Sequence, residues 1–164
     1  MEEPIKHFIE LANKNLSQSK VRVDAPNHKG GNWWLNISQG NKHFTLEYRP
    51  QKGFGLFYEG AGYGEGPAEI YQIPELVVKR LSQLIRANNK DSFKPNLKDI
   101  RELYGQSQVD VARRVKVKQS AISRFEKRNE VKLSTLASVV KALGGQLEVR
   151  ARFSDADVPI SISK

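Results

Sequence analysis

The residues with the clearest chemical potential are a run of cations between positions 113 and 128. This window holds seven Lys and Arg residues against one glutamate. Cations at this density attract polyanions, because each one can neutralise a phosphate and release a counterion. The window therefore predicts contact with a phosphate backbone.

Charge is also uneven over the whole chain of 164 residues, whose net charge is +9. Residues 1–90 carry 12 Lys and Arg against 9 Asp and Glu, whereas residues 94–152 carry 14 against 6. The excess in the second part is typical of nucleic-acid binders, although basic proteins that bind none are also common.

Other kinds of chemistry have little support. The chain has no cysteine, which excludes disulfides, thiolate zinc sites and cysteine nucleophiles. Its three histidines show no metal-ligand spacing, and its glycine run at 60–66 lacks the strand, helix and Lys-Ser/Thr of a phosphate loop. An acid–base site among His43, Glu47, Glu65 and Glu69 is conceivable, but nothing in the sequence fixes its geometry. We expect no catalytic residues, no metal site and no cofactor.

The elements that must position the basic window are helical. A first helix is predicted after Asn96, with Leu97, Ile100, Leu103 and Tyr104 on one face and Gly105 at its end. Ser107 and Asp110 have the spacing of a capping box for the next helix. Two helices joined by a short turn need apolar residues inward, a small residue at the crossing and one buried residue in the turn. The matching residues are Val111, Ala112, Val115, Val117, Ile122 and Phe125.

A further helix is predicted with Ser134 as its cap. Leu136, Val139, Val140 and Leu143 would form its inner face, and Gly144 would end it.

Residues 97–144 resemble the Cro/repressor-like helix-turn-helix family. The resemblance rests on LKDIREL, SQVDVARRV, KQSAISRFEK and LSTLASVVKALGG. With the following GGQLEVRARF, the segment is similar to the antitoxin branch of the HigA type, in which a C-terminal strand replaces the fifth helix. The resemblance implies sequence-specific binding of double-stranded DNA.

The resemblance also implies roles for individual residues. The second helix of the motif would enter the major groove, where glutamine can pair with adenine and arginine with guanine. Its groove-facing residues would be Lys118, Gln119, Ser120, Ser123 and Arg124. Gln108 would meet a phosphate, and Lys127, Arg128 and Lys132 would flank the DNA backbone. Arg101 and Glu126 match a structural ion pair of the family.

Three positions depart from the family pattern. Lys116 stands where glycine is usual and would need a positive φ. Lys118 is a poor helix cap, and the loop RNEVK lacks the common glycine. These departures affect the phosphate contacts rather than the fold.

The C-terminal tail alternates, with Leu147, Val149, Ala151 and Phe153 on one face. A lone strand has an unpaired edge. Two copies could pair antiparallel and form a homodimer, or the strand could pair with the N-terminal sheet of its own chain.

The first part of the chain is predicted to be a small α+β unit. Helices are expected over residues 4–16 and 74–88, with loops at 17–32 and 59–71. Between them, WWLNIS, KHFTLEYR and GFGLFYEG alternate as an antiparallel meander, and adjacent Trp33 and Trp34 would face opposite ways. We expect an α+β protein with a boundary near residue 91: residues 1–90 would be a sensing or partner domain and residues 91–164 a helix-turn-helix domain with a terminal strand.

The leading hypothesis is a dimeric transcriptional regulator, acting as a repressor, with an effector or partner protein at the N-terminal domain. An alternative is an antitoxin that neutralises a toxin through residues 1–90 and controls its own operon. A third is an enzyme in residues 1–90 fused to a DNA-binding module. No apolar run approaches the ~18 residues of a membrane span, and the N-terminus does not resemble a secretory signal, so we expect a cytoplasmic protein.

Overall fold

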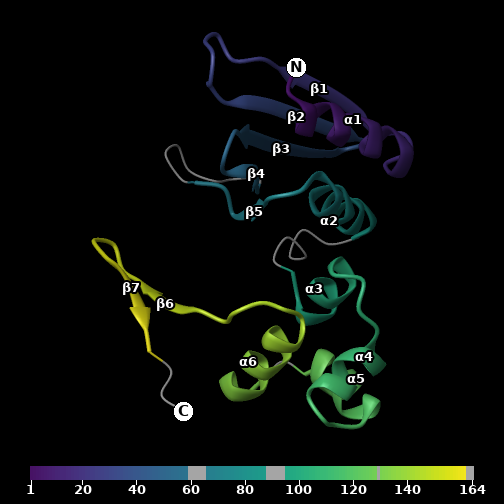
Figure 1. Ribbon diagram of the computed structural model, residues 1–164, viewed down its shortest axis with the longest axis vertical. Helices are drawn as coiled ribbons and strands as arrows, with labels where there is room; N and C mark the ends of the chain where they lie inside the picture. The colour runs from purple at the N-terminus through teal and green to yellow at the C-terminus, as the bar shows by residue number, and fades with distance from the viewer. Residues whose placement is uncertain (59–65, 88–94, 129, 162–164) are drawn as a thin grey trace. The chain divides into compact units, whose positions relative to one another are not determined.

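The computed structural model describes residues 1–58, 66–87, 95–128 and 130–161. The chain divides into two compact units, Met1–Lys94 and Pro95–Lys164, which are described separately below (Figure 1). Within the described ranges, no helix combines the length and apolar character needed to cross a membrane.

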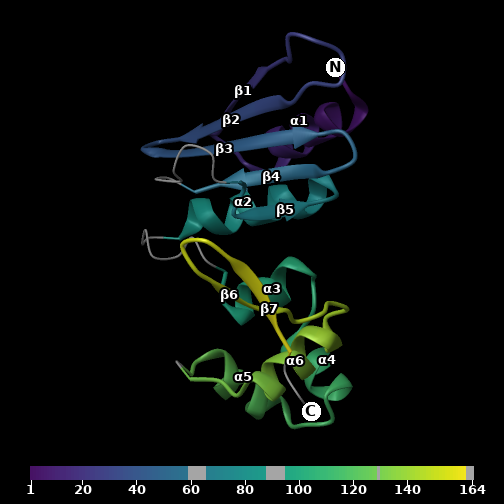
Figure 2. The same cartoon turned by 90° about the vertical axis from the view of Figure 1, so that its left-hand side faces the viewer.

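The described residues of unit 1 form a five-stranded antiparallel meander and two helices. The strands are β1 (Lys20–Asp24), β2 (Trp33–Gln39), β3 (Lys42–Arg49), β4 (Gly53–Phe57) and β5 (Glu69–Tyr71). They lie side by side in chain order (Figure 2). The helices are α1 (Glu3–Asn15) and α2 (Pro74–Arg86), and each has a proline in its first turn. The predicted meander and both helices are confirmed.

One face of this sheet forms the core of unit 1. Leu35, Leu46 and Leu56 are paired across β2, β3 and β4, so their side chains share that face, and all three are fully buried. Phe8 of α1 stacks on Phe54 with ring centroids 5.6 Å apart. Alternation explains the burial, since every second residue of these strands is apolar.

Two predicted loops of unit 1 are partly wrong. Residues 20–24 form β1, in which Val21 and Val23 pair with Ile37 and Leu35 of β2. The segment 59–71 contains β5, which pairs with β4; its residues 59–65 lie outside the described ranges. Trp33 and Trp34 do face opposite ways, because Trp33 pairs with buried Tyr48 whereas Trp34 is exposed.

Unit 2 contains four helices: α3 (Leu97–Leu103), α4 (Gln108–Arg114), α5 (Gln119–Glu126) and α6 (Leu133–Ala142). Both predicted caps form as full capping boxes, Asn96 with Asp99 and Ser107 with Asp110. Lys116 adopts the predicted positive φ of 58° between α4 and α5. The buried core comes from three helices and consists of Val111, Ala112, Ile122 and Val139.

Four predictions for unit 2 are wrong. Tyr104, the C-cap of α3, is exposed, and Val117 in the turn between α4 and α5 is 46% exposed rather than buried. The residue before α6 is Lys132 rather than Ser134, which lies inside the helix. The predicted terminal strand is confirmed as β6 (Val149–Arg152), but it is not a lone strand, because it pairs with β7 (Asp157–Ile160) in a hairpin that forms a sheet of its own.

Candidate nucleic-acid interface

The candidate interface is built on α4 and α5, joined by the turn at residues 115–118. Packing of Val111 and Ala112 against Ile122 fixes the crossing of the two helices. Six of the nine predicted site residues then lie exposed on α5 or directly before or after it, namely Lys118, Gln119, Ser120, Arg124, Lys127 and Arg128. Lys132 is exposed at the start of α6, while Gln108 and Ser123 are half-buried. The first turn of α5 is therefore accessible within unit 2.

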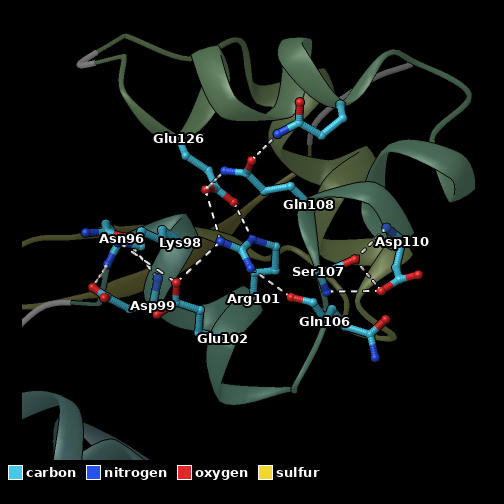
Figure 3. Close-up of polar contacts among 11 residues, drawn as sticks. Asn96, Lys98, Asp99, Arg101, Glu102, Gln106, Ser107, Gln108, Asp110 and Glu126 are labelled. Carbon is cyan, nitrogen blue, oxygen red and sulfur yellow. Dashed lines mark hydrogen bonds and ion pairs between the residues drawn. The ribbon is translucent and has the colours of Figure 1, made fainter.

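A series of hydrogen bonds runs from Gln119 through Gln108 to Glu126, and Figure 3 shows how Gln108 and Glu126 lie. Gln119 Nε2 donates to Gln108 Oε1 at 2.5 Å, and Gln108 Nε2 donates to Glu126 Oε2 at 2.8 Å. Gln119 keeps its own Oε1 and a second amide N–H for another partner. Sequence reasoning predicted separate roles for Gln108 and Gln119 and missed their contact; two glutamines at the starts of consecutive helices were the available signal.

This series of hydrogen bonds ends at the ion pair between Arg101 of α3 and Glu126 of α5. Arg101 donates from Nε to Glu126 Oε1 at 2.5 Å and from Nη2 to Oε2 at 3.2 Å, and its Nη1 donates to the Gln106 carbonyl at 2.8 Å. Both side chains are nearly covered, at 9% and 4% exposed. The predicted ion pair is confirmed, and it connects α3 to α5, the helix that carries the candidate interface.

The ion pair determines the charge state of Glu126. Burial alone would raise the pKa of this carboxyl, but hydrogen bonds from Arg101 and Gln108 and the charge of Arg101 outweigh it, so the pKa is lowered. For Arg101, the hydrogen bond to Glu126 is the main reason that its pKa is raised. Both groups are thus charged at neutral pH.

The lowered pKa of Glu126 predicts how acid affects unit 2. A carboxyl whose pKa is lower in the folded state contributes stability above its unfolded pKa and loses that contribution as the pH falls through the folded value. We expect the stability advantage of wild type over Glu126→Gln to be full at about pH 7 and to shrink below about pH 4. Urea unfolding over this range measures it; an advantage independent of pH would contradict the assignment.

The exposed cations of the interface carry unneutralised charge. None of Lys118, Arg124, Lys127, Arg128 and Lys132 forms an ion pair with a carboxylate in the described part of unit 2. An anion that approaches α5 therefore meets a positive field with no internal counterion.

Of the conceivable acid–base site in unit 1, Glu47 and Glu69 are not brought together, and Glu65 lies outside the described residues. Glu47 pairs with Gly55, and Glu69 with Leu56, so the two carboxylates lie on opposite faces of the sheet. Glu47 accepts hydrogen bonds from Asn32 and Arg49, and Glu69 from Arg80 and two tyrosines. Among the described residues, no cluster of His, Asp or Glu could hold a metal ion.

Comparisons with known proteins concern unit 2. The model of the family described as "Helix-turn-helix" matches residues 97–149. The chain is similar to the solved structure titled "DNA bound antitoxin HigA3", with 32% identity over 43% of this chain and 95% of that one, and a TM-score of 0.41. It is also similar to "Induced DNA bending by unique dimerization of HigA antitoxin", with 33% identity over 42% and 95% and a TM-score of 0.40. No curated protein matches.

The matched segment coincides with the four helices whose caps, turn and ion pair have been described. Its core residues Val111, Ala112 and Ile122 are among those expected from the sequence pattern, and its Arg101–Glu126 pair is the one that the family resemblance implied. Through residues 97–149 the chain belongs to the helix-turn-helix family.

Proposed function

We propose that this protein is a dimeric regulator that binds double-stranded DNA at a specific sequence and represses transcription by occupying its site. The observation that carries the proposal is the exposed first turn of α5, which presents Gln119 and Ser120 beside Arg124. A helix in the major groove reads bases through its N-terminal residues. The cations around it supply the affinity for phosphates that does not depend on sequence.

Each interface residue has a role that follows from its chemistry. Gln119, held by Gln108, can pair with adenine through its free Oε1 and N–H, and Arg124 can pair with guanine through two hydrogen bonds. Lys118, Ser120 and Ser123 would complete the groove-facing surface. Backbone contacts would come from Gln108, Lys127, Arg128 and Lys132.

Removal of Arg124 tests base recognition. We expect Arg124→Ala to weaken specific binding by roughly 1–3 kcal/mol and to relax preference at one base pair per half-site. Fluorescence anisotropy with a selected duplex and its single-base variants measures both effects. The matched control is Lys141→Ala, which removes an exposed cation of α6 outside the proposed interface. Equal losses in the two variants, with discrimination unchanged, would show that Arg124 acts only through its charge.

We further propose that the C-terminal hairpin forms the dimer. Val149 pairs with Ile160, and Ala151 with Val158, so these four residues form one apolar row, in which Val158 and Ile160 are exposed. A two-stranded hairpin alone is marginally stable, and pairing with a second copy would cover the row. Such a dimer could set two α5 helices about 34 Å apart for a palindromic site.

A charge in the apolar row should break this dimer. We expect Val158→Lys to weaken dimerisation by at least about tenfold, since burying the new ammonium would cost free energy. Analytical ultracentrifugation of the full chain measures the change. Ser154→Lys adds the same charge in the β6–β7 turn and should leave the dimer intact. A dimer unaffected by Val158→Lys would place the interface elsewhere.

An antitoxin is the second candidate function. The segment from Gln119 to Phe153 resembles antitoxins of the HigA type, and unit 1 is a separate folded body that could hold a partner. As an antitoxin, the protein would bind a toxin through unit 1 (predicted as residues 1–90). As a repressor, it would use unit 1 to sense an effector. Co-purification of the full chain with the product of the neighbouring gene would favour the antitoxin, provided that the contact is made by unit 1 and not by unit 2. Both candidate functions require contact with DNA. The protein is therefore still predicted to be cytoplasmic.

A further inference from the structure

A groove between α5 and α6 shares Arg124, Arg128 and Lys132 with the interface described above, but its apolar lining has no role there. Its volume is about 780 Å³, which lies in the range of small-molecule sites. Its apolar lining comes from the turn before α5, from α5 itself, from the segment before α6 and from α6, through Val117, Phe125, Val131 and Val139. The groove thus lies within unit 2, behind the helix proposed to read DNA.

Two of these apolar residues are unusually accessible. Val117 is 46% exposed and Val131 is 36% exposed, although the helix-turn-helix pattern places an inward apolar residue at Val117. Apolar side chains that line a concavity and remain in water favour an apolar occupant, because its binding removes their surface from water.

The groove also carries charge of one dominant sign. Arg124, Arg128 and Lys132 line it, against a single acid, Glu130. Three hydroxyl groups, from Ser134, Thr135 and Ser138 of α6, add hydrogen-bonding capacity to the wall. An apolar floor beside three cations is complementary to a molecule with a hydrocarbon body and an anionic head.

We propose that this groove binds a free amphipathic carboxylate, with the alkyl chain against Val117, Phe125, Val131 and Val139 and the carboxylate at Arg124, Arg128 or Lys132. The coupling of this ligand to DNA rests on the proposed function. Arg124 belongs both to the groove and to the proposed base-reading surface, so a carboxylate bound to it withdraws it from DNA. The two ligands should therefore oppose each other, and by the same factor in both directions.

Isothermal titration calorimetry of the full chain with decanoate, below its micelle-forming concentration, tests binding without DNA. We expect saturable binding of decanoate and little or none of decanol or of decyltrimethylammonium, which lack the anionic head. Arg128→Gln should weaken binding by about tenfold through loss of a charged hydrogen bond. Ser138→Trp should weaken it by filling the groove. Lys141→Gln, on the same helix but outside the groove, should bind decanoate as wild type does.

Several outcomes would overturn the proposal. They are absence of saturable binding, equal binding of decanol and decanoate, binding unchanged in both Arg128→Gln and Ser138→Trp, and binding only to anionic phosphatidylglycerol vesicles. Loss of self-association in Val131→Lys, with no decanoate binding by wild type, would assign the groove to a second copy instead. Decanoate binding by a protein that binds no duplex would sustain the site and remove only its coupling to DNA.

Discussion

Replacing Arg80 by methionine is expected to lower the free energy of unfolding of unit 1 by about 3–5 kcal/mol, because it leaves a buried carboxylate without its cation. Arg80 of α2 donates from Nε and Nη2 to Glu69 of β5, at 3.0 Å for each closest pair of atoms. The two side chains are 2% and 11% exposed. Tyr58, which follows β4, and Tyr71 of β5 also donate to Glu69, so this carboxylate joins α2 to β5 and to the end of β4.

The two tryptophans make this prediction easy to measure. Both lie in β2, so tryptophan fluorescence during urea unfolding reports on unit 1. The matched control is Arg22→Met, which breaks an ion pair of the same 3.0 Å length with Asp24 at 78% and 41% exposure. An exposed pair of this kind contributes about 0–1 kcal/mol. Equal effects of the two substitutions would contradict the importance of burial.

A double substitution separates the ion pair from the packing. Arg80→Met combined with Glu69→Gln removes the uncompensated charge while keeping an acceptor for the tyrosines. We expect it to recover much of the stability lost in Arg80→Met alone. The tyrosines themselves stay protonated at neutral pH, since burial and the neighbouring Glu69 raise the pKa of Tyr58 to about 12.

Replacing Arg101 by methionine should have a comparable effect on unit 2, about 3–5 kcal/mol, and should also weaken DNA binding. Glu126 would remain nearly buried without its cation, with Gln108 as its described hydrogen-bond donor. Without Arg101, Glu126 could change its position, and Gln108, which donates to it, would move with it. Because Gln119 donates to Gln108, the orientation of Gln119 at the start of α5 would then change as well. Hydrogen exchange of α4 and α5 measures the stability of unit 2, and anisotropy measures the affinity for DNA.

The control for Arg101 is Arg113→Met. Arg113 forms an exposed pair with Asp110 at 3.5 Å, and its removal should change the stability by less than about 1 kcal/mol. DNA affinity should be measured at a temperature at which Arg101→Met is folded. If the variant is less stable but binds DNA as tightly as wild type there, the hydrogen bonds that lead to Gln119 have no part in recognition.

The helices of unit 2 could be predicted because their signals are local. Ser107 and Asp110 are three residues apart, and the capping box they form depends on nothing distant. The Arg101–Glu126 pair followed from the family resemblance. The exposure of Val117 could not be predicted from its place in the motif, because it depends on the groove that α5, α6 and the segment before α6 form together around it.

The strands β5 and β7 were not predicted, because their formation depends on contacts with other parts of the chain rather than on local signals. Pro159 argues against a strand, yet β7 tolerates it because β7 pairs on one side only. β5 has three residues beside a glycine-rich segment, too few for a visible alternation. The Arg80–Glu69 contact joins residues 11 positions apart in different elements, so only the folded sheet brings them together.

The measurement that tests the central claim most directly is selection of bound sequences from a random duplex library by the full-length protein. It should be run in parallel with Gln119→Ala/Arg124→Ala, a variant that retains the core of unit 2. We predict that wild type enriches a palindromic sequence and that the variant retains weak, salt-sensitive binding without that enrichment. No enrichment by wild type, or the same motif from both proteins, would contradict the assignment of α5 as the helix that reads DNA.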